Sequence, residues 1–184
     1  MNSAFKLRQA THYLRQGGVI AYPTEAVYGL GCDPFNVDAV TQLLAFKRRA
    51  MEKGFILIAA DIEAVEPLVD FSRVFDKQAI YDSWPGPVTW VLPVREGVPG
   101  WLKGIHNSIA VRVTDHPVAA GICKSFGGMV ISTSANKSGK TPARTALKVR
   151  KYFPSSEIFV IPGRVGPLSQ PTQIFNSEDG KRLR

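Results

Sequence analysis

The sequence predicts one α/β domain over residues 1–184, with a twisted mixed sheet and flanking helices. Short apolar runs of strand length alternate with longer segments of helical periodicity, which is typical of an α/β fold. Some expected strands follow one another without a helix between them, so the sheet is not expected to be fully parallel. A chain of 184 residues, of which 45% are hydrophobic and 21% charged, fits a single domain with an ordinary core.

The first half of the chain is expected to hold two helices and two strands. The pair Gly17-Gly18 ends the first helical segment, and Asn36 offers a side chain that caps the second. An unbroken apolar run is typical of a strand buried on both faces. The expected elements are a helix over 3–16, a strand over 19–22, a loop containing Gly29, Gly31 and Pro34, a helix from Asn36 through Phe46, and a strand over 55–60.

The second half is expected to alternate strands with shorter helices. Two prolines within residues 84–87 predict a rigid turn, and Asp115 stands where it could cap a helix. The other expected elements are helices over about 61–69 and 72–82, strands over 88–93 and 108–113, a helix ending at Phe126, a strand over 129–132, a helix over 143–152, and extended segments over 158–161 and 172–175.

The formal net charge of +8 is unevenly distributed along the chain. Residues 116–156 hold seven Lys or Arg and no acid, whereas residues 61–82 hold six acids and two basic residues. A basic surface attracts polyanions such as nucleotide phosphates or RNA. Scattered lysines more often mark a solvated helix face, but the long acid-free stretch favours a surface that faces an anion.

Several classes of protein are disfavoured by what the sequence lacks. No stretch approaches the roughly 20 apolar residues of a membrane span, and the first residues do not resemble a secretory signal. Cys32 and Cys123 lie far apart and outside zinc or redox spacings. We therefore expect a cytoplasmic protein without a membrane anchor, a disulfide or a protein-bound metal.

Hydroxyl and amide side chains follow the ends of two buried strands, where ligands bind in open α/β sheets. Thr24 and Glu25 follow the first strand, and the run from Ser132 to Gly139 follows another. Small residues there let a ligand approach the backbone closely. Taken alone, the first segment is better explained as a turn with Thr24 as a cap, whereas the cations around the second favour a binding site.

A basic cluster, Lys47-Arg48-Arg49, follows the second helix. A lysine and a guanidinium two residues apart could hold a polyphosphate. The alternative is that these cations only stabilise the C-terminus of the helix by interacting with its dipole. We expect Lys47 and Arg49 to be solvent-accessible, so that alanine at either position lowers nucleotide affinity and leaves the fold intact. The phosphate loops GxxxxGK[ST] and GxGxxG are missing, so ATP binding would need another arrangement.

Arg112 stands in an otherwise apolar strand. An unpaired buried charge is costly, so Arg112 either pairs with an acid such as Asp115 or contacts an anionic ligand, and both alternatives fit equally well. The scattered histidines have no nucleophile or metal-ligand pattern beside them. Hydrolase and metalloenzyme functions are therefore weakly supported.

Five segments in this order resemble the YrdC/TsaC family of threonylcarbamoyl-AMP synthases. They span residues 19–145, with weaker similarity to the C-terminus, and the length matches the family's short form. The segments are Tyr22-Pro23-Thr24-Glu25, Lys47-x-Arg49, Trp84-Pro85-Gly86-Pro87-Val88-Thr89, Ala110-Val111-Arg112-Val113 and Ser132-Thr133-Ser134-Ala135-Asn136-x-Ser138-Gly139.

The resemblance implies a concave, positively charged cavity and a nucleotidyltransferase activity. Threonine's amine would capture bicarbonate as a carbamate, which would attack the α-phosphorus of ATP and expel pyrophosphate, with Mg²⁺ expected. The resemblance further implies that tRNA-modification partner proteins receive the product to modify the adenosine next to the anticodon, and that tRNA or other RNA could bind the basic cavity. It places catalysis on Lys47 and Arg49, ATP binding on Lys47, Arg49, Ser108, Ser134, Asn136 and Arg184, and threonine binding on Thr24, Arg112, Ser132 and Thr172.

The chain departs from the family pattern at two places. Ala50 stands where the family usually has proline, and no histidine ends the strand over 55–60. Two other functions fit the sequence in part. One is an RNA-binding module without catalysis, which the charge alone would explain; the other is an enzyme that acts on carbamoyl phosphate, against which the missing additional domains argue.

Overall fold

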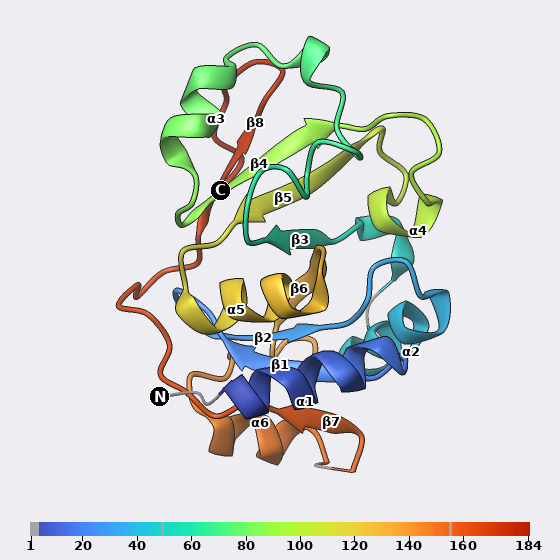
Figure 1. Cartoon of the computed structure of the whole chain (residues 1–184), viewed down its shortest axis with the longest axis vertical. Coiled ribbons are helices and arrows are strands. Elements are labelled where there is room, and N and C mark those ends of the chain that lie inside the picture. The colour runs from blue at the N-terminus through green and yellow to red at the C-terminus, as the bar shows by residue number, and fades with distance from the viewer. Residues whose placement is uncertain (1–3, 49, 155) are drawn as a thin grey trace.

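The computed structural model describes residues 4–48, 50–154 and 156–184, and its strands form one twisted, mixed sheet (Figure 1). The strands are β1 (Val19–Pro23), β2 (Tyr28–Gly31), β3 (Ile56–Ala59), β4 (Val88–Pro93), β5 (Ser108–Val113), β6 (Val130–Ser134), β7 (Ile158–Val160) and β8 (Gln173–Asn176). Their order is β7-β1-β2-β6-β3-β5-β4-β8. The pairs β1–β7, β3–β5 and β4–β8 are parallel and the other neighbours are antiparallel, which confirms the predicted mixed sheet.

Side chains cap the N-termini of three helices, at Asn36, Asp76 and Thr145. Asn36 Oδ1 accepts a hydrogen bond from the Ala39 amide at 3.0 Å, as predicted, and Thr145 caps a later helix in the same way. Within the described residues, no helix has the length and apolar character that a membrane crossing requires. The helices are α1 (Ala4–Arg15), α2 (Val37–Lys47), α3 (Lys77–Ser83), α4 (Gly100–Lys103), α5 (Pro117–Phe126) and α6 (Ala146–Tyr152), with 3-10 turns η1 (Met51–Lys53) and η2 (Phe71–Arg73).

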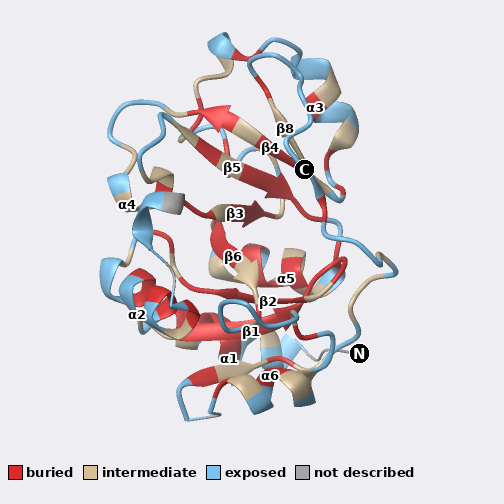
Figure 2. Ribbon diagram, turned by 180° about the vertical axis from the view of Figure 1, so that it is seen from behind, coloured by how far each residue is buried: buried red, intermediate tan, exposed pale blue. Residues whose placement is uncertain are grey.

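Two hydrophobic cores bury the sheet, and Figure 2 shows the strands as the most buried part of the chain. In the smaller core, α1 and α5 lie side by side and pack on Ile20, Tyr22 and Val130 (Figure 1). The alternate strand residues, such as Ala21 and Ile131, belong to the larger core on the other side. Period-two alternation therefore divides the buried apolar residues of β1 and β6 between the two cores.

The face that carries the smaller core changes from apolar to polar along two strands. On β6, Val130 lies in that core, and Ser132 and Ser134 follow it on the same face. On β1, Ile20 and Tyr22 are in the core, and the next residue in this alternation is Thr24. This face of the sheet therefore carries hydroxyl side chains beyond the point where the apolar contacts with α1 and α5 end.

The prediction of a loop at Gly29 and Gly31 is wrong, because both residues lie in β2, between β1 and β6. A Cβ atom on Gly31 would lie 2.3 Å from the carbonyl oxygen of Ile131. Glycine is required there by the close approach of the neighbouring strand rather than by a turn.

Two further predictions need correction. The helix predicted over 61–69 is not formed: these residues form turns, with Val65 and Val69 buried, and Pro67 interrupts the helical pattern. In the second predicted helix, over 72–82, α3 begins only at residue 77. Asp115 does not cap α5, because the N-cap position belongs to His116, whose side chain makes no capping bond.

Replacing Gly31 with alanine is expected to destabilise the protein by about 1–3 kcal/mol, because the added methyl group must displace the backbone of β6. Urea denaturation followed by circular dichroism measures the effect. The matched control is Gly128→Ala, whose Cβ would meet no atom within 4 Å. Equal unfolding free energies for the two variants would contradict the inferred strand contact.

Candidate functional site

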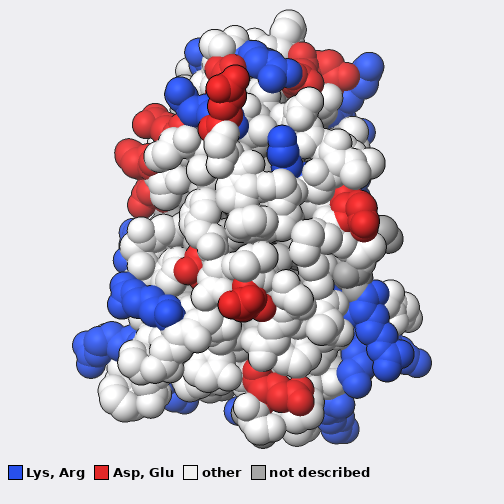
Figure 3. All heavy atoms as spheres, turned by 90° about the vertical axis from the view of Figure 1, so that its right-hand side faces the viewer, with Lys and Arg blue, Asp and Glu red and all other residues white. Residues whose placement is uncertain are grey.

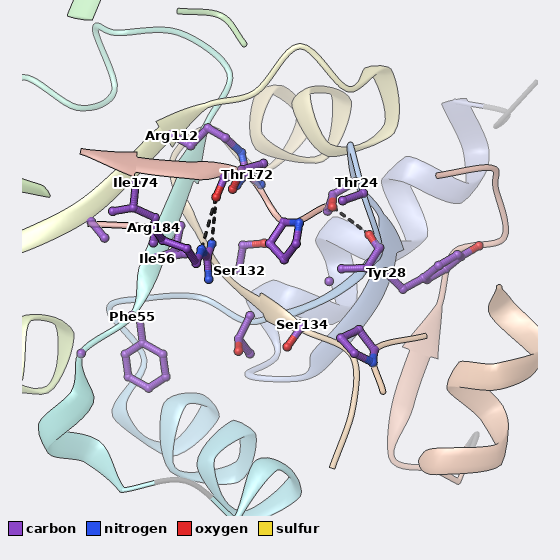
Figure 4. A pocket seen from close by; sticks show the side chains of 18 of the residues that line it. Thr24, Tyr28, Phe55, Ile56, Arg112, Ser132, Ser134, Thr172, Ile174 and Arg184 are labelled. Carbon is purple, nitrogen blue, oxygen red and sulfur yellow. Dashed lines mark hydrogen bonds between the residues drawn. The ribbon is translucent and has the colours of Figure 1, made fainter. Parts of the chain in front are cut away.

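A cavity of about 590 Å³ opens beside the polar end of β6 (Figure 4). Apolar residues of the sheet, including Ile56, Val91 and Ile174, form part of its wall. Its polar side chains come from segments that are far apart in the sequence. They are Thr24, Tyr28, Arg112, Ser132, Thr133, Ser134, Thr172 and Arg184.

The floor of the cavity is formed by the turn after β1 and by the strands β2 and β6. Thr24 Oγ1 donates to the carbonyl oxygen of Val27 at 2.7 Å, so Thr24 both closes the turn and lines the cavity. A Cβ atom on Gly29 would lie 3.2 Å from Ser132 Oγ and 3.3 Å from Thr24 Cγ2. The absence of a side chain at Gly29 therefore keeps the hydroxyl-bearing floor open.

Lys47 joins the end of α2 to the end of β6. Its Nζ donates to the carbonyl oxygen of Ser134, lies 3.4 Å from Ser134 Oγ, and lies 3.1 Å from Asn136 Oδ1. Ser134 Oγ also donates to Asn136 Oδ1 at 2.6 Å. The lysine and the Ser-x-Asn segment singled out by the sequence therefore meet at one place.

The expectation that Lys47 is solvent-accessible is wrong, because the residue is only 6% exposed. Its ammonium group satisfies oxygen atoms of the loop after β6, so Lys47 has a structural role whatever ligand binds nearby. Arg49, predicted to act with Lys47, lies outside the described residues.

Arg112 pairs with an acid, but the acid is not Asp115. Its Nη2 lies 3.2 Å from Glu25 Oε2, and both side chains are 6% exposed. Its Nη1 donates to Thr172 Oγ1 at 3.0 Å. Asp115 is exposed, whereas Glu25 reaches Arg112 from the turn after β1. The structure thus confirms an internal ion pair and also brings Arg112 to the cavity wall.

Arg184 completes this side of the cavity. Its Nε and Nη2 donate to the carbonyl oxygen of Thr172 at 3.3 and 3.1 Å (Figure 4). Partial burial and then the nearby charge of Arg112 lower the pKa of Arg184 below its ordinary value. Among the described residues, no carboxylate side chain forms a salt bridge with Arg184, so its charge is available to an anionic ligand.

Ser108 is the one described residue of the predicted ATP and threonine sites that does not line the cavity and makes no side-chain hydrogen bond to a lining residue. It lies at the start of β5, paired with Pro93. Ser108, Ala110 and Arg112 share one face of β5 because they are two residues apart. Ser108 therefore lies beyond the cavity wall on the face that forms it.

The described lining contains two arginines and no carboxylate side chain. Figure 3 shows lysines and arginines gathered on both lower flanks of one side of the molecule, with acids along its upper left. No cluster of three potential metal ligands occurs in the described part of the chain. The arrangement is that of an α/β protein with an open, hydroxyl-lined cavity suited to an anionic small molecule.

Comparisons with known proteins agree with this architecture. Residues 12–184 match the model of the Sua5/YciO/YrdC family, which carries the description "Telomere recombination". A protein named threonylcarbamoyl-AMP synthase from Methylococcus capsulatus (strain Bath) is 57% identical over 99% of this chain and 98% of its own length. A protein of the same name from Cellvibrio japonicus is 49% identical over 97% of this chain and 95% of its own. The chain belongs to the Sua5/YciO/YrdC family.

A solved structure supports the same assignment at the level of fold. The structure of P. abyssi Sua5 complexed with L-threonine superposes with a TM-score of 0.89, at 28% identity, over 98% of this chain. This chain spans 53% of that longer protein. E. coli YciO, at 22% identity and a TM-score of 0.81, shares the fold.

Replacing Lys47 with methionine is expected to destabilise the protein by about 1.5–3 kcal/mol, because the partly buried oxygens of Ser134 and Asn136 lose a charged donor. Chemical denaturation checks this value. The control is Lys124→Met on α5, where the lysine is exposed and the change should stay below about 0.5 kcal/mol. Unfolding free energies within that limit for both variants would show that Lys47 is not a structural link.

Proposed function

We propose that the protein is an L-threonylcarbamoyl-AMP synthase, a nucleotidyltransferase that uses L-threonine, bicarbonate and ATP. The observation that carries the proposal is the meeting of hydroxyl and cationic groups from separate segments in one cavity. The names of relatives that match nearly the whole chain support the same activity, as does the threonine named in the P. abyssi complex.

In the proposed reaction, the threonine nitrogen attacks the carbon of bicarbonate and a carbamate forms with loss of water. A carbamate oxygen then attacks the α-phosphorus of ATP, the bond to the bridging oxygen breaks, and pyrophosphate leaves. Two anions, bicarbonate and ATP, must be brought together with the carboxylate-bearing threonine, so fixed cations and hydroxyl donors lower the barrier by positioning and by electrostatic stabilisation. The reaction needs no protein nucleophile.

We propose residue roles from positions in and beside the cavity. We assign the triphosphate to Lys47, Ser134, Asn136 and Arg184, with Arg49 and Ser108 as further nucleotide contacts. We assign threonine to the neighbouring part of the wall, next to Arg184, where Thr24, Arg112, Ser132 and Thr172 offer hydroxyl and guanidinium donors. Lys47 and Arg49 are the proposed catalytic residues; Lys47 would act there while it holds the loop after β6.

Mg²⁺ is proposed as a companion of the nucleotide rather than as a protein-bound ion. Mg²⁺ prefers carboxylate, phosphate and water oxygens, and the described lining offers no carboxylate side chain. The residues present therefore do not fit a dedicated metal site, and no step is assigned to a metal held by the protein.

The product is an activated carbamoyl adenylate, and we propose that partner proteins transfer it to the adenosine beside the anticodon of tRNA. The exposed cations of the acid-free segment, such as Arg150 and Lys151 on α6, could bring tRNA close. Binding of RNA without catalysis is the competing function, and a chemical assay separates the two.

Pyrophosphate release is expected only when L-threonine, bicarbonate and ATP are all present, because the carbamate must form before ATP is attacked. A coupled pyrophosphate assay with single omissions measures this dependence, and mass spectrometry should detect the adenylate. Release at the same rate without threonine would rule out the proposed synthase.

Replacing Arg184 with methionine is expected to raise the KM for ATP about 10–100-fold, because a charged donor to a phosphate is lost. The control Lys181→Met removes an exposed cation of the same C-terminal segment, which pairs with Asp179, and should leave KM within about twofold. Equal KM values for the two variants would remove Arg184 from the nucleotide site.

A further inference from the structure

Glu25 is a buried carboxylate to which the residue roles above give no part. It lies in the turn between β1 and β2, is 5% exposed, and is not among the residues that line the cavity. Thr114 Oγ1 donates to Glu25 Oε1, and the His116 amide in turn donates to Thr114 Oγ1 at 3.2 Å. The carboxylate is therefore oriented from the end of β5.

The backbone around Glu25 is fixed by a second segment. The Gly166 amide donates to the carbonyl oxygen of Thr24 at 2.9 Å, and the Leu168 amide donates to that of Glu25 at 3.2 Å. A Cβ atom on Gly166 would lie 2.6 Å from the Glu25 carbonyl oxygen. The turn has little freedom to move, so the position of the Glu25 carboxylate is set by the fold.

Glu25 and Thr172 hold the two ends of the Arg112 guanidinium. One terminal nitrogen faces Glu25 at 3.2 Å and the other donates to Thr172 at 3.0 Å. The backbone oxygen of Thr172 accepts from Arg184. Thr172 therefore joins two guanidinium groups, of which only Arg112 has a carboxylate partner among the described residues.

The charge balance of the cavity depends on this pairing. With Glu25 ionised, the Arg112 pair contributes no net charge, and Arg184 provides the net positive charge of this side. Without Glu25, two adjacent guanidinium groups would face the cavity, an arrangement that recognises phosphate strongly. A zwitterionic amino acid carries no net charge and gains less than a polyanion from a second cation.

We propose that Glu25 is a positioning and specificity-determining residue. Its carboxylate neutralises the charge of Arg112, so that the part of the cavity lined by Arg112 binds an amino acid and excludes a polyanion other than the nucleotide. This inference rests on the proposed function. Glu25 would thereby distinguish Arg112, proposed to contact the amino acid, from the neighbouring Arg184, proposed to contact the nucleotide. Pyrophosphate, the product of the proposed reaction, is the natural probe for the loss of that separation.

The test uses calorimetry on the full chain with pyrophosphate and L-threonine as separate ligands. In Glu25→Gln, which keeps the shape of the side chain and can still accept from Thr114, pyrophosphate should bind about tenfold more tightly, whereas the affinity for threonine should change by less than about threefold. Pyrophosphate should also compete with threonine. A merely structural role would weaken both ligands together.

The double variant Glu25→Gln with Arg112→Met removes both charges and is the matched control. Its pyrophosphate affinity should return to that of the unaltered protein or fall below it, and a persistent gain would overturn the proposal. Unchanged or weaker pyrophosphate binding in folded Glu25→Gln would also overturn it. If that variant does not fold, Glu25→Asp, which withdraws the carboxylate from Arg112, should show a smaller shift in the same direction; no shift there counts against the proposal.

The binding comparison needs no turnover, so its outcome is independent of the assay for the proposed function. If the unaltered protein releases no threonine-dependent pyrophosphate, the synthase proposal fails even when Glu25→Gln gains pyrophosphate affinity. If release is normal and the affinity does not change, only the role of Glu25 fails.

Discussion

The buried charge of Arg112 constrains much of the structure around the cavity. A guanidinium in the middle of a sheet must be satisfied, since an unpaired buried charge costs several kcal/mol. Its partners come from the turn after β1 and from the segment before β8. The requirement to satisfy one strand residue therefore holds together three parts of the chain, and Arg184 joins them through Thr172.

The same geometry explains why a cavity exists on a sheet that is otherwise well covered. The helices α1 and α5 cover one face only where its residues are apolar. Beyond them, β6 continues with serines, and Gly29 leaves the neighbouring strand without a side chain. A hollow with hydroxyl donors on its floor and guanidinium groups on its wall follows from this change in residue type.

Local pattern predicted most of the strands, because apolar runs and turn residues are properties of short segments. It failed at β2, where Gly29 and Gly31 resemble a loop but serve close strand packing, and at residues 61–69, where Val65 and Val69 are buried within turns. Pro67 was the signal against a helix there. The candidate site was found as separate motifs, and the family resemblance supplied their roles.

What the sequence could not provide was the pairing between distant residues. Glu25 stands beside Thr24 in the sequence, yet its contact with Arg112 depends on how β1 and β5 are brought together by β2, β6 and β3. Lys47 looked exposed because its partners, Ser134 and Asn136, approach only in the folded chain. Burial and charge pairing are tertiary properties. In the sequence, the nearest indication of them is a charged residue within or directly after an apolar strand, because such a charge needs a partner in the fold.

The central claim is that one cavity holds a triphosphate beside an amino acid. A crystal structure of the chain with a non-hydrolysable ATP analogue and L-threonine tests it most directly. The account predicts phosphates near Ser134 and Arg184, with the threonine carboxylate close to Thr172 and Arg112 in the same hollow. Either ligand bound at a separate surface, with the hollow left to solvent, would contradict it.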